Sequence, residues 1–250
     1  MKLIVTGATG LVAQEVLRQG LRNPAIQKIV AVARKPVTIP ALEGGVDASK
    51  LRSVVVPDYD NYPPGVKEEF SGADACIWTV AITPTKSKDY PFAEVQRICQ
   101  TSTLVGINAM REAGLGSPFR FIYMSGIAAE RDQSKTPPML PEYSLMRAIE
   151  WITDIKILQG ETENRVLAFA SEHKVAEGFE ACVVKPGLIT HDAASVARAE
   201  DLQRTMGIPN ITVEEVAAAM LHQVIHGFEK EPLVNEDLVR IGRKALEDGL

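Results

Sequence analysis

The chain begins with a short apolar run, a loop that contains two glycines and a stretch with helical spacing. This order restricts the possible folds more than any other feature. Residues 3–6 predict a strand and residues 11–22 a helix. Gly7 permits a tight turn between them, and Gly10 lets the backbone approach a phosphate group closely. Ala13 stands where a third glycine is common and still allows close helix–strand packing. The pattern indicates a nucleotide-binding βαβ unit.

The rest of the chain alternates short apolar runs with longer helical stretches. The apolar runs are residues 3–6, 28–33, 52–56, 75–81, 119–124 and 181–185, and the helical stretches are 11–22, part of 91–113, 141–173 and 213–227. Such alternation predicts parallel strands joined by crossover helices and buried on both faces. We therefore expect one α/β domain over residues 1–250. Its doubly wound, mostly parallel Rossmann sheet would bind ligands at the carboxyl ends of the strands.

Residues 190–210 carry no clear period. The C-terminal part, about residues 187–250, is expected to contribute a small region that covers the substrate.

Composition narrows the function classes. The 250 residues carry a net charge of −5 with no long basic run, which argues against a nucleic-acid partner. The N-terminal apolar run is too short for a membrane span or a secretory signal, so a soluble cytoplasmic protein is expected. Cys76, Cys99 and Cys182 are too scattered for a disulfide framework or a zinc site. No His-Glu-x-x-His motif or cluster of metal ligands is present in the sequence, and no metal is expected.

Two cations follow the second predicted strand. Enzymes that bind NAD usually carry an acidic residue at this position, for the ribose 2′-hydroxyl. This chain has Arg34 and Lys35 instead, and an arginine can form a two-pronged contact with a 2′-phosphate. A solvated basic pair is the alternative, but the missing acid favours NADP. Asp58, after the third strand, either faces the adenine or begins a turn.

The chain resembles the atypical short-chain dehydrogenase/reductase family, in its NmrA-like branch. The resemblance covers nearly the whole chain and rests on four motifs, which are TGATGxxA at 6–13, VARK at 32–35, YMSG at 123–126 and KPGLI at 185–189. Fungal NmrA-like proteins of secondary metabolism look most similar, through RDQ at 131–133 and LVNEDLVRIGRKAL at 233–246.

The resemblance implies a Ser–Tyr–Lys arrangement in the active site. Ser125 matches the serine that holds a carbonyl oxygen, and Tyr143 matches the general acid. The spacing Tyr143-x-x-x-Arg147 matches Tyr-x-x-x-Lys, with arginine in place of lysine. Arginine keeps the positive charge but cannot relay a proton. A plain strand end at Ser125 and an amphipathic helix start at 143–147 are the alternatives.

The resemblance also implies an insertion at residues 148–159. The family usually continues from Tyr-x-x-x-(Lys/Arg) directly into Gly-x-x-Glu, which here begins only at Gly160. The insert would loop out or shift the face of the helix that follows. An alternative alignment places Ile155 and Gln159 where the tyrosine and lysine belong, and the catalytic pair would then be lost.

The resemblance and the glycine loop together define the predicted cofactor site. In the family the turn after strand six faces the nicotinamide, and its backbone can bond the carboxamide. The predicted cofactor-binding residues are Gly7, Ala8, Thr9, Gly10, Leu11, Val12, Arg34, Lys35, Asp58, Thr79, Val80, Ala81, Lys185, Pro186, Gly187 and Leu188.

The function expected from these features is NADPH-dependent reduction of a small carbonyl compound. The substrate would be a ketone or quinone, such as a secondary metabolite. Two alternatives remain open. One is a non-catalytic NADP-binding regulator of the NmrA type, and the other is a non-redox isomerase or lyase on the same fold.

Overall fold

A seven-stranded parallel sheet forms the centre of the molecule. The computed structural model describes residues 1–38, 47–134 and 148–249. The sheet strands are β1 (Lys2–Thr6), β2 (Lys28–Ala33), β3 (Leu51–Val55), β4 (Ala75–Trp78), β5 (Phe119–Met124), β6 (Phe179–Lys185) and β9 (Leu233–Val234). Every pairing is parallel, in the order β3-β2-β1-β4-β5-β6-β9. The strand order reverses between β1 and β4, where doubly wound sheets bind ligands. The doubly wound α/β fold predicted from the sequence is confirmed.

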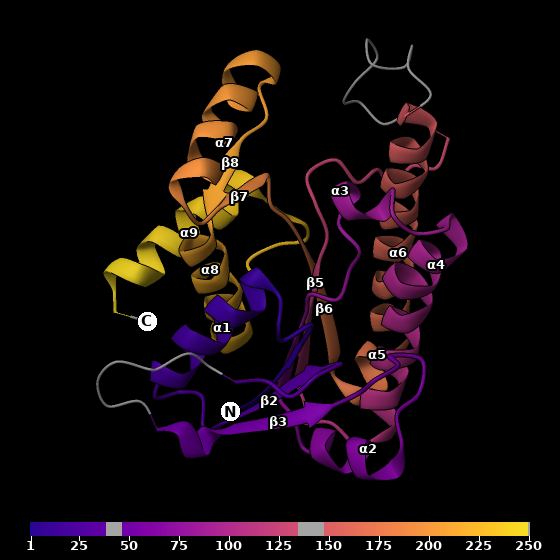
Figure 1. Ribbon diagram of the computed structural model, residues 1–250. Coiled ribbons are helices and arrows are strands. Elements are labelled where there is room, and N and C mark those ends of the chain that lie inside the picture. The colour runs from indigo at the N-terminus through magenta and orange to yellow at the C-terminus, as the bar shows by residue number, and fades with distance from the viewer. Residues whose placement is uncertain (39–46, 135–147, 250) are drawn as a thin grey trace.

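Helices cover both faces of this sheet (Figure 1). On one face lie α1 (Leu11–Arg22), α8 (Val213–His226) and α9 (Asn235–Glu247). On the other lie α2 (Pro64–Phe70), α5 (Ser102–Glu112) and α6 (Ala148–Glu177). Two short helices, α3 (Pro84–Ser87) and α4 (Phe92–Gln96), follow β4, and a π turn over Arg97–Thr101 joins α4 to α5.

The alternating side chains of each strand supply both halves of the core. In β1, Leu3 and Val5 pack on the α1 and α8 side, whereas Ile4 packs on the opposite side. The second side is rich in aromatic residues and includes the fully buried Trp78 and Phe121. Because the inner strands are enclosed in this way, their sequences are mostly apolar, as residues 29–33 of β2 are.

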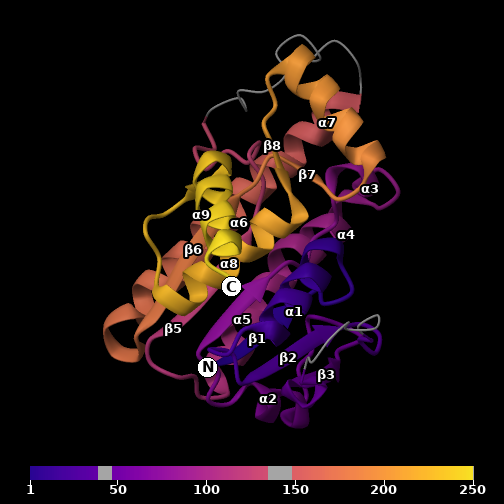
Figure 2. The same cartoon turned by 90° about the vertical axis from the view of Figure 1, so that its left-hand side faces the viewer.

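The C-terminal region adds a small layer above the carboxyl edge of the sheet (Figure 2). It contains β7 (Leu188–Thr190), β8 (Asn210–Thr212) and α7 (Ala193–Met206). Residues 190–210 carry no clear apolar period, yet most of them form the helix α7. Helix α7 begins at a capping box between Asp192 and Ser195 and ends at Gly207, which has a φ of 66°. These local signals stabilise a helix even though few of its side chains are buried.

The segment proposed as an insertion does not loop out. Residues 148–159 form the first turns of α6, which continues without interruption to Glu177. At 1.5 Å per residue these twelve residues lengthen the helix by about 18 Å. Helix α6 crosses the loop after β5 at Gly160, where an added Cβ would lie 1.6 Å from the Glu130 carbonyl oxygen. No helix in the described part of the chain is long and apolar enough to cross a membrane.

Candidate functional site

A cavity of about 570 Å³ opens at the carboxyl ends of β1, β2, β3 and β4, next to the reversal in strand order. It contains eight of the sixteen predicted cofactor-binding residues, drawn from four separate segments of the chain. Those eight are Gly7, Thr9, Gly10, Arg34, Asp58, Thr79, Val80 and Ala81. These eight residues, which are distant in the sequence, therefore line one cavity. The other residues that line this cavity are Pro57, Tyr59, Ile82, Lys86, Tyr90, Arg97, Ile98 and Ser102.

The glycine loop is shaped by contacts with the end of β4. Gly7 has a φ of 68°, and an added Cβ would lie 2.7 Å from the Thr79 Oγ1 atom. Thr79 Oγ1 itself donates to the Thr6 carbonyl oxygen over 2.7 Å. Gly10 caps α1, and no side chain bonds the free N–H groups of its first turn. These N–H groups and the positive end of the helix dipole form a site for an anion such as a phosphate.

Tyr59 supports this loop from below, a role that the sequence did not reveal. Its hydroxyl accepts from the Gly7 N–H over 3.3 Å and donates to the Val32 carbonyl oxygen over 3.2 Å. The ring is buried and packs edge-on against Trp78. Burial raises the pKa of the Tyr59 phenol to about 12, which the bond from Gly7 only partly opposes. Tyr59 therefore remains a neutral link between the glycine loop and β2.

The two predicted cations after β2 differ in position. Arg34 lines the cavity and is exposed, and among the described residues no carboxylate pairs with it. Lys35 is exposed but does not line the cavity. Arg34 is therefore the one of the pair that can reach a ligand in this cavity.

Asp58 lines the cavity but is already paired. It accepts from the Arg97 guanidinium over 3.1 Å, and Arg97 also contacts Asp60 at 2.6 Å and Glu94 at 2.9 Å. A backbone bond from Asp60 and the charge of Arg97 lower the pKa of Asp58. Asp58 thus stays ionised, and its remaining lone pairs are free to accept from an amino group such as that of adenine.

The other eight predicted residues do not line the cavity, and four of them belong to the glycine loop, the start of α1 and the end of β2. Ala8 and Val12 are buried in the core between β1 and α1, while Leu11 and Lys35 are exposed. Only backbone atoms of Ala8 and Val12 can meet a ligand.

The two N–H donors of the turn after β6 are both bonded within the protein. Gly187 donates its N–H to Asn235 Oδ1 over 2.8 Å, and Leu188 donates to the Pro209 carbonyl oxygen over 2.9 Å. Pro186 has no N–H to donate. Since both available donors already have partners, this turn cannot donate to a carboxamide without breaking a bond. Its close packing against Pro209 instead joins β6 to the C-terminal region.

Ser125 lies directly after β5, as predicted, and its hydroxyl proton is used in a bond within the protein. Its Oγ donates to Glu163 Oε1 over 2.5 Å. Glu163 is fully buried on α6 and also binds Arg131 at 2.6 Å and Lys185 at 3.2 Å. Lys185, predicted to bind the cofactor, points its ammonium group to Glu163 and to the Ala129 carbonyl oxygen at 2.7 Å.

Glu163 is at the centre of this network, and the sequence drew attention to it only as part of a family motif. A hydroxyl has one proton, so Ser125 cannot polarise a carbonyl while it donates to this carboxylate. Tyr143 and Arg147 lie outside the described residues, as does the side chain of Ile155. The pairing of Tyr143 with Arg147 therefore stays a prediction.

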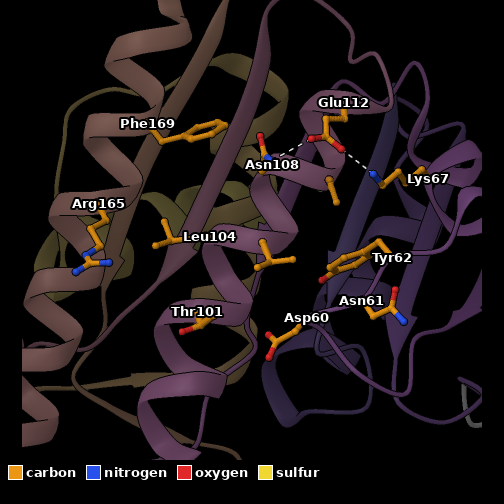
Figure 3. A pocket seen from close by; sticks show the side chains of 12 residues that line it. Asp60, Asn61, Tyr62, Lys67, Thr101, Leu104, Asn108, Glu112, Arg165 and Phe169 are labelled. Carbon is orange, nitrogen blue, oxygen red and sulfur yellow. Dashed lines mark hydrogen bonds and ion pairs between the residues drawn. The ribbon is translucent and has the colours of Figure 1, made fainter. Parts of the chain in front are cut away.

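A second and larger groove, of about 710 Å³, lies on the outer face of α5 (Figure 3). Thr101, Leu104 and Asn108 line it from the π turn and α5, and Arg165 and Phe169 from α6. None of the predicted site residues lines this groove. Among the described residues, no group of three or more His, Cys, Asp and Glu side chains is placed to hold a metal ion.

The fold and the cavity define a class of dinucleotide-binding α/β proteins. The chain belongs to the NAD(P)H-binding family, whose sequence model matches residues 7–226. A curated relative is the leucinostatins biosynthesis cluster protein T of Purpureocillium lilacinum, with 30% identity over 127 residues. The match covers 50% of this chain and 42% of that protein, so this chain spans less than half the length of its relative.

Solved structures with low sequence identity share the fold. Vestitone reductase from alfalfa (Medicago sativa) has a TM-score of 0.61 with 15% identity, covering 93% of this chain and 76% of that one. The yeast methylglyoxal/isovaleraldehyde reductase Gre2, solved with NADPH, has a TM-score of 0.59 with 17% identity, covering 94% and 77%. MoeE5, solved with UDP-glucuronic acid and NAD, has a TM-score of 0.63 with 16% identity, covering 94% and 75%. The chain thus shares the NAD(P)-binding α/β fold of these structures.

Proposed function

We propose that this protein is an NADPH-dependent oxidoreductase that reduces a small carbonyl compound, a ketone or quinone, free in the cytoplasm. The observation that carries the cofactor choice is the position of Arg34. It lines the nucleotide cavity at the end of β2, carries no ion pair with the described carboxylates, and replaces the acid that an NAD enzyme uses there. A guanidinium matches a 2′-phosphate in both charge and geometry.

The residues of the cavity fit a dinucleotide. The uncapped start of α1 receives the diphosphate, Gly7 and Gly10 allow close approach, and Asp58 accepts from the adenine. When bound, the nicotinamide supplies the hydride. Tyr143 then donates the proton to the carbonyl oxygen, and the charge of Arg147 favours the phenolate that remains. Ser125 assists only if its hydroxyl breaks the hydrogen bond to Glu163 and donates to the carbonyl oxygen instead.

One observation favours a second function, that of an NADP-binding regulator without turnover. The hydroxyl of Ser125 and the ammonium group of Lys185 are both directed to Glu163, which is completely buried. A site whose polar groups satisfy one another in this way binds a cofactor without needing to activate a substrate. A non-redox isomerase or lyase would differ from both in turning over a substrate without net loss of NADPH.

The test is turnover of a panel of small ketones and quinones in the presence of NADPH, and the loss of NADPH absorbance measures the rate. We expect the wild type to oxidise NADPH and Tyr143→Phe to be slower by about a hundredfold or more, since general acid catalysis contributes that much. Tyr90→Phe is the matched control, because Tyr90 is a half-exposed tyrosine of the same cavity. Tight NADPH binding without turnover on any compound would favour the regulator.

A further inference from the structure

A cation on the β4 side of the nucleotide cavity has no role assigned by the sequence. Among the described residues, the cationic side chains that line this cavity are Arg34, Lys86 and Arg97. Arg97 is neutralised by the carboxylates of Asp58, Asp60 and Glu94. Lys86, like Arg34, pairs with no carboxylate of the described chain. The cavity therefore contains two separate cations that remain available for an anionic ligand.

The segment that carries Lys86 is fixed on both sides. Ile82 is buried against Val95 and Cys99, and its N–H lies 3.3 Å from the Cys99 sulfur. At the other end, Ser87 is completely buried. Between these anchors α3 turns Lys86 outward, where its side chain is exposed and lines the cavity. The position of the ammonium group thus follows from the packing of its neighbours.

The strand order separates the two cations. Arg34 follows β2, the glycine loop follows β1, and Lys86 follows β4, and these strands lie in the order β2-β1-β4. The glycine loop and the start of α1 therefore lie between Arg34 and Lys86. A dinucleotide whose diphosphate occupies the start of α1 has its 2′-phosphate on the Arg34 side. Lys86 then approaches the diphosphate from the opposite side.

We propose that Lys86 binds the diphosphate of the dinucleotide and contributes equally to NADPH and NADH binding. This inference rests on the proposed function, since it assumes that a nicotinamide dinucleotide occupies the cavity. Each phosphate group has its own partners. Arg34 holds the 2′-phosphate, and the start of α1 together with Lys86 holds the diphosphate. A lysine suits the second role because it acts on a phosphate as a mobile point charge.

The test is the affinity of Lys86→Ala and Arg34→Ala for NADPH, NADH and ADP-ribose, measured by calorimetry at fixed salt. ADP-ribose keeps the diphosphate but has neither nicotinamide nor 2′-phosphate. We expect Lys86→Ala to bind all three about tenfold more weakly, the usual loss for a charged hydrogen bond. Arg34→Ala should weaken only NADPH. Lys88→Ala is the matched control, because Lys88 is an exposed lysine two residues away that does not line the cavity.

Three results would overturn this assignment. Unchanged affinity in Lys86→Ala excludes the contact. An equal loss in Lys88→Ala means that net charge alone is responsible. If Lys86→Ala loses affinity for NADPH alone, Lys86 contacts the 2′-phosphate and not the diphosphate. In all three cases the wild type still binds NADPH, and the proposed function survives. A wild type that binds neither NADPH nor NADH contradicts both.

Discussion

Ser125 donates its only hydroxyl proton to Glu163 over 2.5 Å, and this bond joins the end of β5 to the buried face of α6. The carboxylate also holds Arg131 and Lys185, so one fully buried acid connects three segments of the chain. Arg131 in turn contacts Glu231, which extends the network toward β9. Burial lowers the pKa of Arg131, but the bonds to Glu231 and Glu163 outweigh it and raise that pKa overall.

Removing the charge of Glu163 should strongly destabilise the fold. Glu163→Gln leaves Arg131 and Lys185 without their shared carboxylate, and we expect the free energy of unfolding to fall by about 3 kcal/mol. Urea unfolding measures this loss. Glu161→Gln is the control, since Glu161 on the same helix makes a more exposed ion pair with Arg165, and it should cost less than about 1 kcal/mol. Equal losses in the two variants would contradict the central role of Glu163.

Ser125→Ala should lose stability rather than cofactor affinity. The variant takes one donor from a buried carboxylate, so the free energy of unfolding should fall by about 1–2 kcal/mol. The affinity for NADPH should stay within about twofold, because Ser125 does not line the nucleotide cavity. Unfolding in urea and calorimetric titration on the same preparation separate the two effects. A variant of full stability that binds NADPH poorly would place Ser125 in the cofactor site instead.

Gly7→Ala should combine backbone strain with a steric clash. The left-handed φ costs about 1–2 kcal/mol for alanine, and the Cβ would meet Thr79 Oγ1 at 2.7 Å. Gly72→Ala is the matched control, because Gly72 has a φ of 66° and no atom within 4 Å of an added Cβ. We expect Gly72→Ala to show only the strain, and Gly7→Ala to lose more stability and also NADPH binding. Equal losses of stability and of NADPH binding in the two variants would contradict the steric clash at Gly7.

The buried phenol of Tyr59 should make stability depend on pH at the alkaline end. Its pKa is about 12 in the folded protein, against about 10 for an exposed tyrosine. A raised pKa means that the unfolded chain loses this proton first. The contribution of about 3 kcal/mol is therefore complete below pH 10 and is lost as the pH rises through 12. Tyr59→Phe should flatten the decline in unfolding free energy between these values, and identical curves would show that Tyr59 titrates normally.

The sequence predicted the layered sheet, and half of the residues proposed for the cofactor line one cavity, because both results depend on local patterns. Continuous apolar runs marked the strands, and β2 and β5 were predicted to the residue. The glycine loop, Arg34 and residues 79–81 follow strand ends, and parallel strands bring their carboxyl ends to one edge. Position along the chain was therefore enough to place these residues together.

What the sequence did not reveal depends on contacts between distant segments. Glu163 is an acid among other polar residues of a helix, and only its packing against β5 and β6 shows that it is buried. Tyr59 lies in a loop and packs against Trp78, and Lys86 lies in the short helix α3, after a segment that Cys99 holds. Helix α7 was missed because its apolar spacing is weak, although the pair Asp192 and Ser195 was a usable start signal.

The most direct test of this account is the affinity of the wild type for NADPH and NADH, compared with that of Arg34→Ala and Lys35→Ala. Arg34 lines the cavity and Lys35 does not. We expect the wild type to bind NADPH at least about tenfold more tightly than NADH, and Arg34→Ala to lose that preference. Lys35→Ala should keep it. A wild type that binds NADH as tightly as NADPH would contradict the assignment of Arg34 to a 2′-phosphate.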